Sequence, residues 1–268
     1  MIFDYVAFTH AGSYYQENQD AVLINGVTIQ DPNYFSSGRL DNDTPRKAPS
    51  VRVAVADGVS GLPAAALASK TLCEQLARID QKGLRIPPSG MAEELRDALS
   101  AEARRDKSKL DGGAALVTAE MYSDFIRLWH AGDCRGYLFK PEGGVLTQLT
   151  EDHTLRAELI KAEQVAGKKV GSGAFNKNYG SFSNSVENLF VLSPYSDAPK
   201  PTTCLPTVNE GEILLLCSDG LFENLSNQQL ERILQTGDLE TGVRGLLKAV
   251  LGFPKSDNIS VIALQRRN

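Results

Sequence analysis

The feature that most constrains the fold is a run of four short apolar segments between residues 114 and 149. They cover residues 114–122, 125–131, 135–140 and 145–149, and only two to four turn residues separate them. A parallel crossover needs about a dozen residues, so links this short join antiparallel strands. The sequence therefore predicts an antiparallel meander in this region.

The remaining apolar segments predict further strands, together with helices that come in groups. Strands are expected at 3–9, 21–24, 51–56, 213–217 and 259–264, and helices at 63–79, 91–107, 155–162, 227–234 and 239–251. Because the helices do not alternate with the strands, an α+β fold is expected, with two antiparallel sheets packed face to face and helices on both outer sides. We expect a single domain over residues 1–268.

Two polar segments interrupt this pattern. Residues 30–50 lack periodicity and are interpreted as a loop insertion, and a second polar loop is expected at 168–188, within a stretch rich in Gly, Asn and Ser. Long loops in a compact domain usually have a functional role, so both segments are candidates for selecting a ligand.

Composition excludes several classes of function. The chain has 28 Lys plus Arg against 33 Asp plus Glu, a formal charge of −5, which argues against nucleic-acid binding. No apolar run approaches the roughly 18 residues that span a bilayer, so no membrane partner is expected. Four scattered cysteines predict free thiols and a cytoplasmic protein, and three histidines argue against a His-rich zinc site.

Acidic residues stand at the ends of five predicted strands. These residues are Asp20, Asp57, Asp133, Asp219 and Asp257. If the strand ends converge, the carboxylates repel one another and either raise each other's pKa or bind divalent cations. Carboxylates with few neighbouring His or Cys favour magnesium or manganese. For any one of these acids alone, a simple turn or cap remains the alternative.

The segments around these acids resemble the motifs of metal-dependent protein phosphatases of the 2C type, in the bacterial style. The first motif corresponds to Gly12–Asp20, with its ending Asn-Gln-Asp, and the second to Val-Ala-Asp-Gly-Val-Ser-Gly at 55–61. The later motifs follow in the family's order at 131–138, 149–155, 216–221 and 256–261. The resemblance spans nearly the whole chain.

The resemblance implies a phosphatase that hydrolyses phosphoserine and phosphothreonine with a metal-activated water. It implies two Mn²⁺ or Mg²⁺ ions, with a third, weaker ion beside them. Asp57 would bridge the two ions, the Gly58 carbonyl would bind one, and Asp219 and Asp257 would complete the ligands. Asp20 would act through a bound water, and Asp133 would share the third ion with Asp219. The catalytic residues would thus be Asp57, Asp219, Asp257 and Asp20.

Three positions depart from the family's pattern. Tyr15 stands where many members have an arginine that binds the substrate phosphate, and it lacks that residue's charge and two-pronged donor geometry. Val59 stands where some animal relatives have a histidine. The usual Gly-Thr-Thr motif is Gly113-Ala114-Ala115. Tyr15 is therefore a candidate for weak substrate binding.

The expected partners are phosphorylated proteins and an opposing serine/threonine kinase, and a monomer is expected. Residues 155–206 correspond to a flap beside the metals in relatives. One alternative is a pseudophosphatase, which binds a phosphoprotein without hydrolysing it. Another is a phosphatase of the sporulation and stress-response type, which acts on an anti-sigma antagonist.

Overall fold

Two antiparallel sheets form the centre of the protein in a computed structural model. The structure describes residues 1–41, 51–59, 61–62, 64–83, 85–106, 110, 112–165 and 185–267. The first sheet has the spatial order β4 (Asn33–Asp41), β1 (Ile2–His10), β13 (Ile259–Arg267), β12 (Ile213–Cys217), β8 (Arg135–Lys140) and β9 (Val145–Gln148). The second has β11 (Thr202–Cys204), β7 (Ile126–Ala131), β6 (Gly112–Met121), β5 (Val51–Gly58), β2 (Ala21–Ile24) and β3 (Val27–Ile29), and β10 (Phe190–Leu192) pairs with β6.

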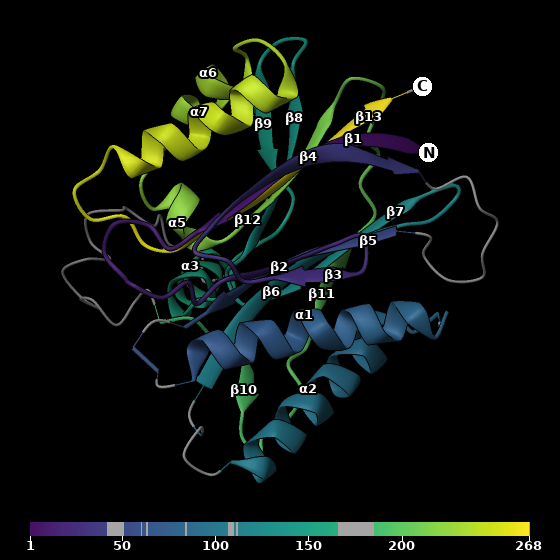
Figure 1. The fold of residues 1–268 in the computed structure, drawn as a ribbon, viewed down its shortest axis with the longest axis vertical. Coiled ribbons are helices and arrows are strands. Elements are labelled where there is room, and N and C mark those ends of the chain that lie inside the picture. Colours follow the sequence, from purple (N-terminus) through teal and green to yellow (C-terminus); the bar gives the residue numbers. More distant parts are fainter. Residues whose placement is uncertain are drawn as a thin grey trace.

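Helices cover both outer faces of the two sheets (Figure 1). On the second sheet lie α1 (Ala65–Gln81) and α2 (Pro88–Arg105), and on the first lie α5 (Asp219–Phe222), α6 (Asn227–Leu234) and α7 (Leu239–Leu251). The expected α+β sandwich is confirmed. Among the described residues, no helix is long and apolar enough to cross a membrane.

The apolar residues of β5 belong to two of the three core layers of the protein. Val51, Val53 and Val55 pack between the two sheets, whereas Ala54 and Ala56 pack under α1. Both faces are therefore buried, which explains why this strand reads as a continuous apolar run. A third layer lies between the first sheet and the pair α6 and α7.

The predicted meander is wrong at its centre. β7 pairs with β6, but β8 pairs with β12 and β9, so the chain changes sheets between Ala131 and Arg135. A link of three residues is long enough to step between sheets about 10 Å apart as well as to form a hairpin. Gly132 makes this step with φ of +92°.

The predicted loop insertion at 30–50 is wrong for its first half. Residues Asn33–Asp41 form β4, which pairs along its whole length with β1. β4 is an edge strand with exposed serine, glycine and arginine, so it lacks the apolar alternation by which a strand is usually predicted. Residues 42–50 of that prediction lie outside the described part of the chain.

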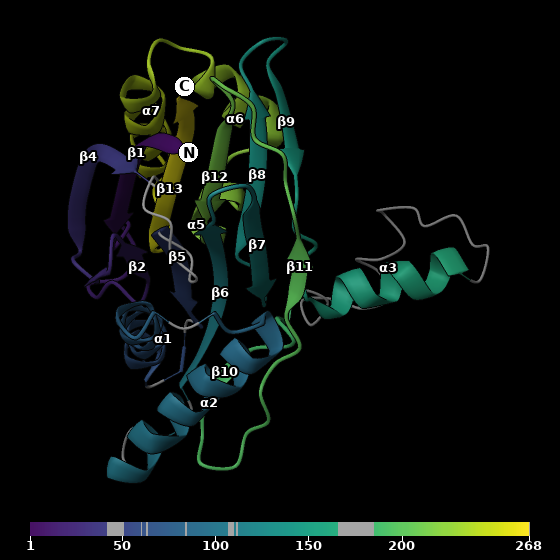
Figure 2. The same cartoon turned by 90° about the vertical axis from the view of Figure 1, so that its right-hand side faces the viewer.

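The predicted flap segment, 155–206, contains three described elements. α3 (Leu155–Val165) begins where it was predicted and projects away from the sandwich (Figure 2). Residues 166–184 lie outside the described part. The chain then returns to the second sheet as β10 and β11, whose three residues each are too short to show a period.

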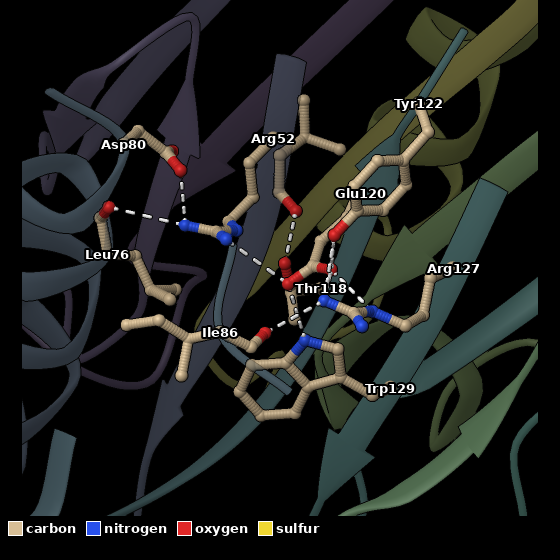
Figure 3. Close-up of polar contacts among 10 residues, drawn as sticks. Arg52, Leu76, Asp80, Ile86, Thr118, Glu120, Tyr122, Arg127 and Trp129 are labelled. Carbon is tan, nitrogen blue, oxygen red and sulfur yellow. Dashed lines mark hydrogen bonds and ion pairs between the residues drawn. The ribbon is translucent and has the colours of Figure 1, made fainter. Parts of the chain in front are cut away.

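A buried ionic network lies where β5 begins and β6 ends, which is the opposite end of β5 from Asp57 (Figure 3). Glu120 is fully buried and accepts hydrogen bonds from Trp129 at 3.0 Å, Arg127 at 2.6 Å and Arg52 at 3.2 Å. Arg52 also pairs with Asp80 of α1. The network thus joins the second sheet to the helix that covers it.

Replacing Glu120 with glutamine is expected to destabilise the protein strongly. The substitution keeps the size of the side chain but leaves the buried charges of Arg52 and Arg127 without their common partner, which costs about 3–5 kcal/mol. Urea unfolding measures the change. The control is Glu102→Gln, which breaks only an exposed pair with Arg105, and a Glu120→Gln loss as small as the control's would contradict the prediction.

Candidate metal centre

The five predicted aspartates lie close enough for their charges to interact, since Asp20, Asp133 and Asp219 act on Asp57, and Asp257 acts on Asp219. They come from both sheets, because Asp20 precedes β2 and Asp57 lies in β5, while Asp219 follows β12 and Asp257 precedes β13. Asp133 lies on the turn by which the chain passes from β7 to β8. The strand ends therefore converge, which is the condition under which the sequence predicted repulsion among these carboxylates.

Asp57 and Asp219 make a direct contact between the two sheets. The backbone N–H of Asp219 donates a hydrogen bond to Asp57 Oδ2 at 3.3 Å. Both side chains are only partly buried, so they lie at the rim of the sandwich and not in its core.

Asp20 lies beneath this pair and is fully buried. The hydroxyl of Ser218 donates a hydrogen bond to Asp20 Oδ2 at 2.7 Å. The same hydroxyl oxygen accepts a hydrogen bond from the backbone N–H of Ser260 at 2.9 Å. The other oxygen, Asp20 Oδ1, is buried and has no hydrogen-bond partner among the described residues. A buried carboxylate oxygen without a donor indicates a missing positive partner.

The loop that carries Asp257 is fixed by Asn258. Its side chain donates to the carbonyl of Ala11 at 2.8 Å and accepts from the backbone N–H of Gln19 at 2.8 Å. Two glycines allow the close approach of neighbouring loops. A β-carbon at Gly12, whose φ is +72°, would lie 2.1 Å from the Asp257 carbonyl oxygen, and one at Gly220 would lie 2.1 Å from that of Asn258.

The carboxyl groups of this cluster hold protons more tightly than free carboxyl groups. Burial, helped by the charge of Asp257, raises the pKa of Asp20 to about 6. Burial and the charge of Asp219 raise the pKa of Asp57 well above its usual value. Burial and the charge of Asp133 do the same for Asp219. Close negative charges without a counter-charge produce this effect.

These observations fit a site for divalent cations. Oxygen-only donors, mutual repulsion and the unpartnered Asp20 Oδ1 are what a hard cation compensates. In the described ranges, no three His, Cys, Asp or Glu side chains already form a coordination group. The carboxylates are nevertheless close enough for their charges to interact.

The other predicted site residues lie on the same loops. Gly58 ends β5, and its N–H donates to the Gln19 carbonyl at 3.2 Å. Tyr15 lies on the loop of Gly12, is partly buried, and meets the ring of Tyr14 edge-on at 4.8 Å between centroids. The alanines that replace the family's threonines pair with β5, Ala115 opposite Asp57 and Ala114 opposite Gly58.

Sequence reasoning missed the residues that hold the aspartates in place. Asn18 donates to Thr9 at 2.7 Å and to the Asp31 carbonyl at 2.8 Å, and it accepts from the N–H of Asp20 at 3.2 Å. Ser218 and Asn258 act as described above. Each stands beside a predicted aspartate within a recognised motif, and that position is the signal that was available.

A cavity of about 660 Å³ opens beside Asp133. Arg135 and Asp152 form one wall and are joined by two hydrogen bonds of 2.8 and 2.6 Å. Phe222 and the first turns of α3 form others. The guanidinium of Arg135 stacks on the Phe222 ring at 3.5 Å.

The chain is similar in sequence to bacterial serine/threonine phosphatases. The serine/threonine protein phosphatase PstP of Mycobacterium tuberculosis is 26% identical over 235 residues, which are 84% of this chain and 42% of that protein. The phosphatase stp of Listeria welshimeri is 30% identical over 169 residues, 63% of this chain and 62% of that protein. The chain thus spans about half the length of these curated relatives. No family model matches the chain.

The solved structure of M. tuberculosis PstP has the same fold. Its TM-score is 0.75 at 22% identity, and the match covers 100% of both chains. A second structure of the PstP catalytic domain, in complex with two manganese ions, has a TM-score of 0.69 at 22% identity, over 99% of both chains. The resemblance to phosphatases of the 2C type is therefore confirmed in sequence and in fold.

Without metal, the stability of the protein is expected to fall as pH rises. The folded-state pKa of Asp20 is about 6, above the value near 4 of an unfolded aspartate, and those of Asp57 and Asp219 are shifted the same way. Folding therefore favours the protonated forms. The stability that protonated Asp20 contributes is complete below about pH 4, its unfolded pKa, and is lost as pH rises through its folded pKa of about 6.

Thermal unfolding in EDTA at pH 5.5 and pH 8 measures this loss. The melting temperature is expected to be lower at pH 8, and saturating Mn²⁺ is expected to restore it. Asp219→Asn removes one charge and is expected to flatten the dependence. A metal-free protein as stable at pH 8 as at pH 5.5 would show that folding does not raise the pKa values of these carboxyl groups.

Proposed function

We propose that the protein is a metal-dependent phosphatase that hydrolyses phosphoserine and phosphothreonine in proteins. The observation that carries the proposal is the meeting of Asp57 and Asp219 from opposite sheets above the buried Asp20. The phosphatase names of the relatives support the same activity. All five predicted aspartates are retained, which favours an enzyme over a pseudophosphatase that only binds phosphoproteins.

We assign the metal ligands as the resemblance to phosphatases of the 2C type implies. Asp57, the Gly58 carbonyl, Asp219 and Asp257 would hold two ions, Mn²⁺ or Mg²⁺, with Asp20 linked through water. Asp133 and Asp219 would hold a third, weaker ion. When bound, such ions activate a water for attack on phosphorus and stabilise the charge on the phosphoryl oxygens.

The chain's own residues orient the ligands and the substrate. Ser218 fixes one oxygen of Asp20, and Asn258 fixes the loop of Asp257. Tyr15, on the loop that packs against Asp257, would donate one hydrogen bond to the substrate phosphate. The cavity beside Asp133 has room for the residues next to the phosphorylated side chain.

We further propose that residues 1–268 act as one catalytic domain and as a monomer in the cytoplasm, opposite a serine/threonine kinase. Cys73, Cys134 and Cys217 are buried free thiols, which supports a reducing compartment. Residues 155–206 and 30–50 would select substrates.

The direct test is hydrolysis of p-nitrophenyl phosphate and of a phosphothreonine peptide. Turnover is expected with Mn²⁺ and is expected to stop in EDTA. Asp219→Asn is expected to reduce the turnover rate at least about 100-fold. Loss of a residue that only supports a metal ligand already costs up to about 100-fold, and Asp219 is itself a proposed ligand.

The matched control is Asp124→Asn, which removes an exposed carboxylate from the turn between β6 and β7. It is expected to retain full activity. If the wild-type protein binds Mn²⁺ by calorimetry but hydrolyses neither substrate, the pseudophosphatase alternative replaces the enzyme.

Replacing Tyr15 with arginine is expected to lower the Michaelis constant for the phosphopeptide about tenfold. A charged, two-pronged donor binds a phosphate more strongly than one hydroxyl, by roughly 1 to 2 kcal/mol. Steady-state kinetics measure the change. Tyr14→Arg adds the same charge at the neighbouring, 58% exposed position and serves as control. If Tyr15→Arg leaves the Michaelis constant for the phosphopeptide unchanged, Tyr15 does not face the phosphate.

A further inference from the structure

His153 joins four segments that are far apart in the sequence. It lies just before α3, and its contacts reach the β7–β8 turn, the chain that returns at residues 185–188, and β11. None of the roles assigned to the metal centre involves this residue. Its contacts indicate a role that depends on hydrogen bonding and not only on packing.

Two hydrogen bonds join His153 to the turn that carries Asp133. The Gly132 N–H donates to His153 Nδ1 at 3.1 Å, and the His153 N–H donates to the Gly132 carbonyl at 3.0 Å. On its other side, Gly132 is packed so tightly that a β-carbon would lie 2.5 Å from Cβ of Ala115. The backbone immediately before Asp133 is thus held from two directions.

The imidazole has one tautomer that satisfies all its partners. Nδ1 receives the Gly132 N–H and also lies 2.9 Å from the side-chain amide of Asn188. Nδ1 is therefore an acceptor, and the proton lies on Nε2, which donates to Thr202 Oγ1 at 2.9 Å. The ring stacks at 4.5 Å on His130, and burial lowers the pKa of both histidines.

The same residue holds the two chains that lead to and from α3. The Glu187 N–H donates to the His153 carbonyl at 2.7 Å, and the Leu155 N–H donates to the Ser185 carbonyl at 3.1 Å. Asn188 continues the connection, because its side chain bonds both the carbonyl and the N–H of Lys200, at 2.8 and 2.7 Å. We call residues 153–155 and 185–188 the stem of α3.

We propose that His153 is a positioning residue that couples the stem of α3 to Asp133 through Gly132. It holds the turn so that Asp133 faces the third, weaker cation, and this role rests on the ligand assignment in the proposed function. Any rearrangement of the stem changes the Gly132 contact and with it the affinity of that cation.

The test compares two amide replacements of His153. Asparagine places an acceptor near the position of Nδ1 and retains the bond from Gly132, whereas glutamine reaches towards Thr202 and loses it. His153→Gln is expected to weaken the third Mn²⁺ about tenfold and to leave the two tighter ions unchanged. His153→Asn is expected to restore wild-type affinity. Calorimetric titration with Mn²⁺ measures each.

Hydrogen exchange of the Gly132 amide in the metal-free protein gives a second measurement that does not depend on activity. Exchange is expected to be faster in His153→Gln than in wild type or His153→Asn.

Several outcomes would overturn the proposal. One is equal Mn²⁺ binding in wild type and His153→Gln, and another is an equal loss in His153→Asn and His153→Gln, which would mean that the ring only packs. A wild-type protein that binds two ions and no third would overturn it while leaving the proposed function intact. A protein that binds no Mn²⁺ would instead refute the proposed function.

Discussion

Electrostatic repulsion among carboxylates at one end of the sandwich is the constraint on which the rest of the structure depends. Asp57 and Asp219 meet there above the buried Asp20, and no basic side chain is hydrogen-bonded to any of the three among the described residues. The opposite end of the same strands offers an internal comparison. There Glu120 is equally buried, but two arginines neutralise it. The first cluster thus carries carboxylates without a neutralising partner among the described residues, which is typical of functional sites.

The scaffold around the carboxylates is made of neutral hydrogen-bonding groups. Ser218, Asn18 and Asn258 each connect an aspartate-bearing loop to a neighbouring strand or loop. Such side chains fix geometry without adding or cancelling charge. The arrangement leaves the carboxyl groups without a neutralising partner, and it explains how loops from two sheets retain their relative positions.

Strongly apolar strands and the gathering of the five aspartates could be predicted from the sequence. β2, β8 and β12 were predicted to the residue, because each is a short run buried on both faces. β4 could not be predicted, since its side chains are polar and only the pairing with β1 makes it a strand. The change of sheet at Gly132 depends on which strands become neighbours, and local sequence does not contain that information.

β5 connects the two buried charge clusters, with Arg52 near one end and Asp57 at the other. Side chains alternate between the faces of a strand, so a shift of one residue would reverse both ends together. It would turn Arg52 away from Glu120 and Asp57 away from Asp219. The ionic network therefore fixes the register of β5, and the position of Asp57 depends on a salt bridge at the other end of the same strand.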